Sequence, residues 1–421
     1  TQSKTFDCAV HCTCQKEIMQ CLGSEMHEIP TILERNQSKF TTLNLRFNKI
    51  QSIENNSFIG LEGLSELDLT GNRISVLSQE MLTGLKNVWN LYIGGKFFTG
   101  FDANSLHQFN NLKLLYLNDN QLTKLTSSIF AHLSKLTIID LYNNRIAYIQ
   151  DGAFRGLAKL KYLKLSSNRI LKLVNRTFST FISLVKLELS SNLIEVIERN
   201  AFTGLINIET IDLSSNNVNK IESQTFSNLS KLKTFVILER FLDNNAIDNI
   251  AVGAFKGLIR LRELWLQGNN LAFINSGMLS YLSNLQILQL SDNQISYLDN
   301  DSLSSLINLD MLNLANNRLT NLSSAAMNGL IALSTLYLDE NRLKQSNFIQ
   351  NLHLPKLRQL YLRNNEIRIS GQIVIDKLYQ LEMIALDGNL ISSYDSILSS
   401  QNSIIKNIPK QETTGFNYVG I

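Results

Sequence analysis

A pattern of apolar residues with a period of about 24 residues constrains this chain more than any other feature. Neither the 3.6-residue period of a helix nor the 2-residue period of a strand explains the pattern beyond a short stretch. A fixed period of this length predicts a solenoid of stacked coils, in which each coil buries its apolar face against its neighbours. In the repeat that begins at Leu184, the positions that define the pattern are Leu184, Leu187, Leu189, Asn192, Ile194, Ile197, Phe202 and Leu205.

An asparagine recurs at one fixed place in each repeat. Its side chain carries both donors and an acceptor, so a buried asparagine can satisfy backbone groups of the turn in its own coil and in a neighbouring coil. Lys96 takes its place in the third repeat, and the step between successive asparagines is longer once, from Asn216 to Asn245. The recurring residues are Asn48, Asn72, Asn120, Asn144, Asn168, Asn192, Asn216, Asn245, Asn269, Asn293, Asn317, Asn341, Asn365 and Asn389.

Bulk properties agree with a solenoid and exclude some other classes. A length of 421 residues alone would suggest two or three domains, but a repeat array grows without one large core. A net charge of +3 favours neither nucleic acid nor an anionic membrane as a partner. No run of about 20 apolar residues predicts a transmembrane helix within the chain. Because the chain begins at Thr1, without Met or a signal peptide, we expect a mature or trimmed product.

All four cysteines lie in one short segment near the start of the chain: Cys8, Cys12, Cys14 and Cys21. Zinc ligands usually come as closely spaced pairs that are separated by a longer loop. Disulfides are typical of a secreted protein, in which they could close the end of the first coil. Four cysteines allow three disulfide pairings, and the spacing alone does not choose among them.

The cysteine segment, the following Ile29-Pro30 and the motif Leu43-x-Leu45-x-x-Asn48 together resemble the N-terminal cysteine cap and first repeat of extracellular leucine-rich repeat proteins. Slit, Toll-like receptor ectodomains and the leucine-rich hormone receptors share this repeat. The resemblance implies disulfides between Cys8 and Cys14 and between Cys12 and Cys21.

The repeat and the resemblance together predict an α/β-type solenoid, a right-handed leucine-rich repeat horseshoe of about 15 repeats. We expect its parallel sheet to line the concave side and an irregular convex side to lie opposite. The predicted domains are an N-terminal cysteine cap over residues 1–39, leucine-rich repeats over 40–404, and a partial C-terminal half-coil and tail over 405–421.

Residue types that support catalysis are sparse in the repeats. No cysteine follows residue 21, and the histidines of the repeats are His107, His132 and His353. Neither a zinc-protease H-E-x-x-H motif nor a phosphate-binding G-x-x-x-x-G-K motif occurs. Catalysis needs convergent groups around a pocket, which a uniform open arc does not provide. We therefore expect no enzyme activity and no cofactor.

The residues between the strand leucines should point out of the concave face, where exposed aromatic side chains are typical anchors of protein interfaces. The alternative is that strands favour aromatic residues and that adjacent tyrosines simply stack. Five extra residues within 238–244 are either a neutral loop or a protrusion that contacts a partner. The predicted partner-binding residues are Trp89, Tyr92, Tyr116, Asp140, Lys164, Glu188, Arg240, Phe241, Trp265, Tyr337, Tyr361 and Arg363.

Six N-glycosylation sequons occur, none of them in the concave columns, and we expect Asn175, Asn228, Asn300 and Asn321 to lie on flanks or convex segments. The six sequons are at Asn36, Asn55, Asn175, Asn228, Asn300 and Asn321.

The leading interpretation is an extracellular protein-recognition module, either secreted or the ligand-binding ectodomain of a membrane receptor. It would hold a protein or another large extracellular ligand, and not nucleic acid, on its concave face. The resemblance implies signalling or innate recognition as common uses. The alternative is a secreted or cell-surface adhesion or structural protein that self-associates, for instance as a homodimer. A minor alternative is an enzyme inhibitor.

Overall fold

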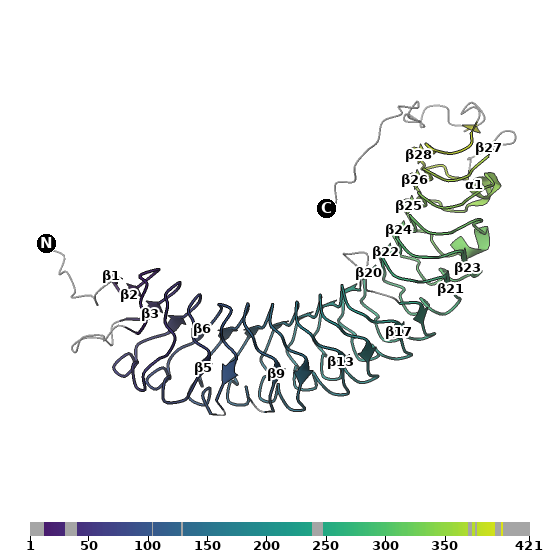
Figure 1. The fold of residues 1–421 in the computed structure, drawn as a ribbon. Helices are drawn as coiled ribbons and strands as arrows, with labels where there is room; N and C mark the ends of the chain where they lie inside the picture. Colours follow the sequence, from purple (N-terminus) through teal and green to yellow (C-terminus); the bar gives the residue numbers. More distant parts are fainter. Residues whose placement is uncertain are drawn as a thin grey trace. The chain divides into compact units, whose positions relative to one another are not determined.

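The computed structural model describes residues 12–29, 40–102, 104–127, 129–237, 247–368, 373–374, 377–391 and 397–398. The chain divides into two compact units, Thr1–Asn217 and Val218–Ile421, and each is a stack of coils (Figure 1). The predicted leucine-rich repeat solenoid is confirmed. Among the described residues, no helix has the length and apolar character that crossing a bilayer requires.

In the first unit, each coil contributes one three-residue strand to a parallel sheet. Every residue of these strands pairs with the residue at the same place in the next repeat, so one coil equals one sequence repeat. The strands are β3 (Thr42–Asn44), β4 (Glu66–Asp68), β6 (Asn90–Tyr92), β8 (Leu114–Tyr116), β10 (Ile138–Asp140), β12 (Tyr162–Lys164), β14 (Lys186–Glu188) and β16 (Thr210–Asp212).

The second unit repeats this arrangement. Here Thr234 pairs with Glu263 across the one lengthened repeat, so the extra residues lie between two strands that stay in register. The insertion itself, with Arg240 and Phe241, lies outside the described residues. The strands are β18 (Thr234–Val236), β20 (Glu263–Trp265), β22 (Ile287–Gln289), β24 (Met311–Asn313), β25 (Thr335–Tyr337), β26 (Gln359–Tyr361) and β28 (Met383–Ala385).

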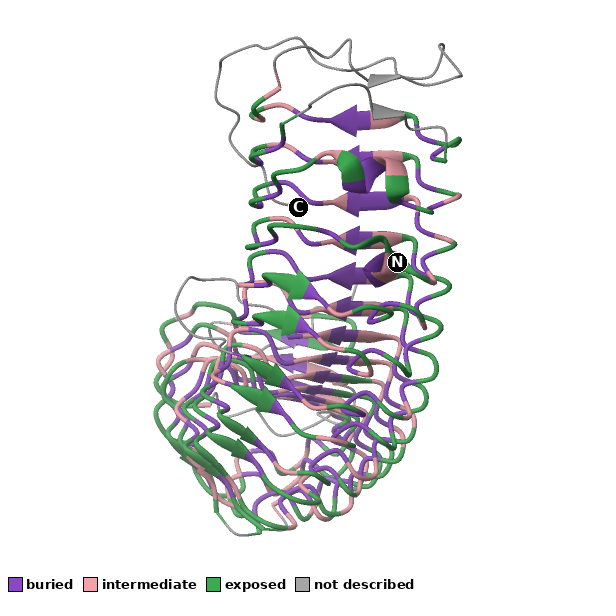
Figure 2. Cartoon of the chain, turned by 90° about the vertical axis from the view of Figure 1, so that its right-hand side faces the viewer, coloured by how far each residue is buried: buried purple, intermediate pink, exposed green. Residues whose placement is uncertain are grey.

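A second row of two-residue strands runs on the opposite side of the coils in each unit (Figure 1). In Figure 2 the sheet strands are largely buried, whereas many of these outer strands are exposed. Two short helices, η2 (Ser324–Met327) and α1 (Asn347–Asn351), replace turns in the second unit. The outer strands pair as β5 (Val76–Leu77) with β7 (Gly100–Phe101), β9 (Lys124–Leu125) with β11 (Tyr148–Ile149), β13 (Lys172–Leu173) with β15 (Val196–Ile197), β17 (Lys220–Ile221) with β19 (Asn249–Ile250), β21 (Phe273–Ile274) with β23 (Tyr297–Leu298), and β27 (Ile373–Val374) with β29 (Ile397–Leu398).

The core is a set of columns, because each repeat places the same residue type at the same depth. The middle residue of each strand is buried, as Leu187 is in β14. On the other side of the core, Phe154, Phe178 and Phe202 stack with ring centroids 6.2 and 6.1 Å apart. Each fully buried side chain of this size contributes roughly 1.5–3 kcal/mol.

The recurring asparagines join each coil to the one before it, as predicted. Asn192 is buried, and its Nδ2 donates to the carbonyl oxygens of Leu165 and Leu189, at 2.9 and 3.0 Å. Its Oδ1 accepts from the amide of Ile170, at 3.0 Å. One side chain therefore satisfies three backbone groups of two coils, which would otherwise be buried without partners.

Lys96 interrupts these connections in the first unit. Its side chain is exposed and has donors but no acceptor, so it cannot replace the asparagine oxygen. Its backbone adopts a left-handed φ of 80°. The next coil resumes the pattern, since Asn120 donates to the carbonyl of Ile93 and accepts from the amide of Phe98.

The residue before each of these asparagines adopts a left-handed conformation in most coils. Asn, Asp, Ser or Gly usually fills this place, but the first repeat has Phe47, with φ 56° and a side chain 58% exposed. Its ring lies against Gly71, where an added Cβ atom would collide with Phe47 Cδ1. A bulky residue at positive φ is a conformational outlier that its surroundings must hold in place.

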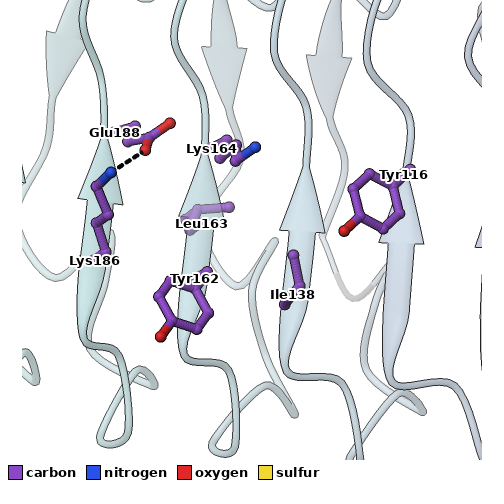
Figure 3. A pocket seen from close by; sticks show the side chains of 7 residues that line it. All are labelled: Tyr116, Ile138, Tyr162, Leu163, Lys164, Lys186 and Glu188. Carbon is purple, nitrogen blue, oxygen red and sulfur yellow. Dashed lines mark ion pairs between the residues drawn. The ribbon is translucent and has the colours of Figure 1, made fainter.

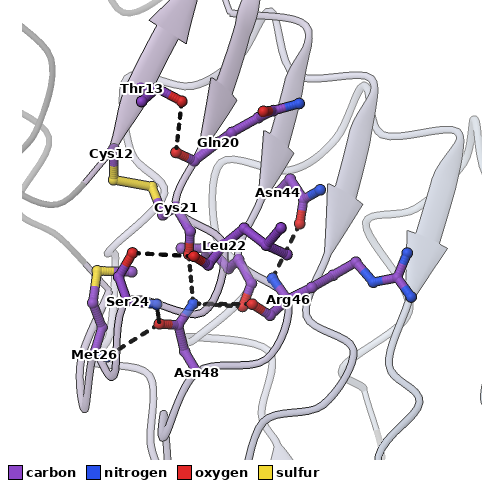
Figure 4. The surroundings of a disulfide bond; sticks show 11 residues. Cys12, Thr13, Gln20, Cys21, Leu22, Ser24, Met26, Asn44, Arg46 and Asn48 are labelled. Atoms are coloured by element: carbon purple, nitrogen blue, oxygen red, sulfur yellow. Dashed lines mark hydrogen bonds between the residues drawn. A yellow bond between two sulfur atoms is a disulfide. The ribbon is translucent and has the colours of Figure 1, made fainter.

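The cysteine segment stacks on the first repeat (Figure 4). A disulfide joins Cys12 to the buried Cys21, and Cys14 is also disulfide-bonded. Cys8, its expected partner, lies outside the described residues. Strands β1 (Thr13–Gln15) and β2 (Ile18–Gln20) form a hairpin, and β2 pairs in parallel with β3. Asn48 donates to the carbonyl of Cys21, at 2.6 Å, and so ties this segment to the first coil.

Candidate functional site

The candidate site lies on the exposed side of the parallel sheet, which we call the sheet face. Successive side chains of a strand point to opposite sides. Because the middle residue of each strand is buried in the core, the first and third residues point outward, as the partly exposed Asn90 and Tyr92 do in β6. These outward residues of neighbouring coils form two columns in each unit.

An aromatic cluster occupies the sheet face around β6 and β8. Tyr92 and Tyr116 stack with ring centroids 4.8 Å apart and an interplanar angle of 17°. Trp89, just before β6, is 44% exposed, and the Lys113 ammonium lies 4.2 Å from the centre of its ring. Partial burial, together with the nearby Glu66 carboxylate, raises the pKa of Tyr92 and keeps its hydroxyl protonated. The sequence placed the three aromatic residues on this face but missed Lys113.

A shallow hollow of about 280 Å³ opens beside this cluster (Figure 3). Tyr116 and Tyr162 stand on either side of Ile138, and Lys164 and Glu188 come from β12 and β14. The complete lining is Tyr116, Ile138, Tyr162, Leu163, Lys164, Lys186 and Glu188. Aromatic and aliphatic groups with charged groups at the edge make a surface that suits an apolar side chain of a partner.

The charges around the hollow are already paired within the chain. Lys164 Nζ lies 3.0 Å from Oδ2 of Asp140, whose side chain is buried, and Lys186 Nζ lies 2.7 Å from Glu188 Oε1. The hydrogen bond to Asp140 raises the pKa of Lys164, so this ammonium stays charged. Neither pair therefore leaves an uncompensated charge in the hollow, and a partner gains there mainly from apolar contact.

Acidic residues of the third strand position have a structural role that the sequence reasoning missed. Oδ1 of Asp140 accepts from the amide of Tyr142, at 3.0 Å, and Asp212 accepts in the same way from Ser214, at 2.9 Å. Such side-chain bonds to the amide two residues later shape tight turns. The signal in the sequence is Asp or Asn at the end of a strand, directly before the turn.

The second unit carries a smaller aromatic cluster. Tyr337 and Tyr361 stack at 4.5 Å and 12°, and the Arg363 guanidinium lies 5.4 Å from the Tyr361 ring centre. Arg363 Nε also lies 3.5 Å from Asp387 Oδ2. Trp265 is partly exposed on β20, and its Nε1 donates to Glu263 at 3.3 Å. The predicted cluster of Tyr337, Tyr361 and Arg363 is thus brought together.

Four residues of the hollow were absent from the sequence-based set: Ile138, Tyr162, Leu163 and Lys186. Leu163 is the buried middle residue of its strand. Ile138, Tyr162 and Lys186 stand at the first position of their strands, whereas most of the predicted residues stand at the third. The two positions share one side of the sheet, so the same alternation could have found them.

The described sequons lie away from the sheet strands. Asn36 is outside the described residues, and the other five asparagines are exposed on turns and outer segments: Asn55, Asn175, Asn228, Asn300 and Asn321. Within the described residues, no group of three or more His, Cys, Asp and Glu side chains converges on a metal position.

Family comparison defines the class of this protein. The leucine rich repeat pattern matches residues 38–96, 110–170, 182–237, 241–295 and 283–343. The chain therefore belongs to the leucine-rich repeat family. No curated protein sequence matches it.

Solved structures share the fold. A leucine-rich repeat protein of Leptospira interrogans is similar with a TM-score of 0.67 and 25% identity, over 89% of this chain and 90% of that one. The Toll–Spatzle complex of Drosophila is described as a hub in development and innate immunity. It contains a chain that is similar with a TM-score of 0.65 and 19% identity, over 84% of this chain and 52% of that one. The leucine-rich repeat domain of APL1 is similar with a TM-score of 0.61 and 22% identity, over 77% of this chain and 79% of that one.

Proposed function

We propose that this chain is a protein-recognition module, without enzyme activity, that binds its partner on the sheet face of the first unit. The observation that supports the proposal best is the hollow beside the stacked Tyr92 and Tyr116, with Tyr162 and Ile138 partly exposed in it. Interface hot spots are enriched in aromatic residues and lie in well-packed pockets from which a partner excludes water.

The partner in this proposal places one apolar side chain over Ile138, between the rings of Tyr116 and Tyr162. Trp89 and its neighbour Lys113 extend the contact along the sheet. Lys164, which pairs with Asp140, and Lys186, which pairs with Glu188, form a polar rim. Binding energy then comes mainly from apolar burial, at about 25 cal/mol per Å² before the costs of association are subtracted.

A peptide library displayed on phage provides a probe that needs no known partner. We expect the chain to select peptides that share a large apolar residue, and the variant Ile138→Arg to lose them because the new side chain fills the hollow. Ser179→Arg, at an exposed turn position away from the sheet strands, is the matched control and should keep them. Selected peptides that bind Ile138→Arg as well as the parent would exclude the hollow as the recognition site.

We also propose an extracellular location, as a secreted protein or a receptor ectodomain. The Cys12–Cys21 disulfide supports this, because disulfides persist in oxidising compartments. The exposed sequons outside the sheet strands support it too, since glycans there would leave the sheet face open. Expression through a eukaryotic secretory pathway should give a product whose mass falls on treatment with an N-glycosidase. An unchanged mass would count against this location.

A second candidate function, self-association, rests on a different observation. Phe273 and Tyr297 stack at 5.6 Å on β21 and β23, and 38% and 51% of their surfaces remain exposed. Sedimentation velocity over a range of concentrations tests it. A dimer that Phe273→Ser abolishes would support an adhesive role, and a monomer at all concentrations would exclude one.

A further inference from the structure

Two histidines from consecutive coils of the first unit lie against each other, away from the sheet face. His107 is on the segment between β7 and β8, and His132 is on the segment between β9 and β10. Their ring centroids are 3.9 Å apart, with an interplanar angle of 57°. Both side chains are exposed. Neither the hydrophobic core nor the proposed recognition surface accounts for this pair.

The solenoid fixes the distance between the two backbones. Leu106, before His107, and Phe130, just upstream of His132, are both buried in the core columns of their coils. The side chains can turn about their own torsions, but their starting points are held by packing. Such pre-organisation lowers the entropic cost of gathering two ligands around one ion.

The spacing is close to what two imidazoles need to share one metal ion. With Zn–N bonds of about 2.0–2.1 Å, two bound imidazoles have ring centres roughly 4.5–5 Å apart. The observed 3.9 Å requires an opening of about 1 Å, which rotation of two exposed side chains can supply. Neutral imidazole is the commonest protein ligand of zinc, copper and nickel.

Gln108 is a candidate third ligand. Gln108 follows His107 in the chain and occupies the place in its own coil that His132 has in the next coil. Its Nε2 is buried and has no hydrogen-bond partner among the described residues. Turning this amide over would break no bond of that nitrogen and would offer a carbonyl oxygen to a cation.

We propose that His107 and His132, with the Gln108 oxygen, form a surface site for a late first-row divalent cation such as Zn²⁺ or Cu²⁺. Water completes the coordination, because the site is open to solvent. An ion there would join two consecutive coils of the first unit by coordinate bonds at a place where the sequence pattern provides only turns.

The test is metal titration of the full chain, first treated with a chelator. Calorimetry with Zn²⁺ should give one binding event per chain, and the spectrum of bound Cu²⁺ in electron paramagnetic resonance should show coupling to two imidazole nitrogens. His107→Ala and His132→Ala should each abolish both signals and leave the circular dichroism spectrum unchanged. His353→Ala, which removes an exposed histidine of the second unit, is the matched control and should retain both.

Three outcomes would overturn the proposal: no binding by the parent chain, binding that survives in both histidine variants, or a Cu²⁺ spectrum with only one nitrogen. Gln108→Leu should weaken Zn²⁺ binding without abolishing it. Unchanged affinity in that variant would remove Gln108 from the ligand set and overturn that part of the assignment.

Discussion

The sheet faces of the two units are built on the same repeat, but a buried carboxylate has a different partner in each unit. In the first unit, the buried Asp140 is paired with the Lys164 ammonium at 3.0 Å. In the second unit, the buried Asp339 accepts a hydrogen bond from the backbone amide of Arg363, at 2.7 Å, and burial raises its pKa. Both units also carry a tyrosine stack, and the hollow described above adjoins the stack of the first unit at Tyr116.

The repeat thus determines the contacts of the buried scaffold residues in both units, and it does not determine which side chains occupy the outward strand positions. The scaffold positions recur with the same contacts in both units, as Asn192 and Asn293 show. The outward strand positions differ from coil to coil, and several of their partners come from adjacent coils, as Asp140 does for Lys164. Recognition therefore depends on which side chains happen to be neighbours in consecutive coils.

The largest expected effect tests the shared scaffold. Asn192→Leu in the first unit and Asn293→Leu in the second should each lower the free energy of unfolding by about 3 kcal/mol, because each leaves buried backbone groups without partners. Urea denaturation measures both. Asn200→Leu, at an exposed turn position, is the control and should change little. Unequal losses at the two asparagines would show that the scaffolds are not equivalent.

The next effect tests the ion pair of the first unit. Lys164→Met should cost about 1–2 kcal/mol at neutral pH, since it leaves the Asp140 carboxylate buried without its cation while the lysine itself is partly exposed. The pKa of Lys164 is raised above its usual 10.5. The stabilisation by the Lys164–Asp140 ion pair is thus complete below pH 10.5, and it is lost as the pH rises through the pKa that Lys164 has in the folded chain. Denaturation curves of parent and variant should therefore converge at strongly alkaline pH, and a constant difference would contradict this origin.

A smaller effect concerns the left-handed residue before the recurring asparagines. Phe47 in the first unit and Asn316 in the second adopt φ values of 56° and 51°. Phe47→Asn should raise stability by about 1 kcal/mol, because asparagine tolerates this conformation better than a bulky residue. Asn316→Phe should lower it by a similar or larger amount. A loss of stability in Phe47→Asn would show that the contacts of the ring outweigh its backbone strain.

The smallest effect concerns Asp339. The pKa of its carboxyl group is raised in the folded chain, so the unfolded chain releases the carboxyl proton at a lower pH than the folded chain does. The free energy of unfolding therefore falls as the pH rises above 3.8 and through the pKa that Asp339 has in the folded chain. In Asp339→Asn, the side-chain oxygen can still accept the hydrogen bond from the Arg363 amide, but the side chain no longer titrates. The pH-dependent loss of stability should therefore disappear. We expect the variant to gain stability relative to the parent as the pH rises from about 3 to about 7. A difference that does not vary with pH would contradict the role of burial.

The sequence predicted the scaffold well because every repeat must fill the same core positions and satisfy the same buried backbone groups. The leucines, phenylalanines and recurring asparagines of fourteen repeats specify the register independently. The same regularity predicted Tyr92 and Tyr116 on one face, where they stack. It could not show that Asp140 is buried or that Tyr162 and Ile138 line a hollow, because these outcomes depend on the rotamers of unlike neighbours in different coils. The adjacency of His107 and His132 is hidden for the same reason, since they stand at different positions of their repeats.

The exposed Lys96 has a consequence for how the first unit opens. In a linear array of repeats, stability is a sum of contributions from each coil and from each contact with its neighbour. Every recurring asparagine in the described part of this unit adds a side-chain connection between consecutive coils, and Lys96 omits one. The boundary between the coil of Lys96 and the coil before it therefore lacks a connection that the other described boundaries of this unit have. We expect partial unfolding from the amino-terminal end to stop at this boundary, so that amide protons of the coils before β6 exchange as one group and those from β6 onward exchange more slowly.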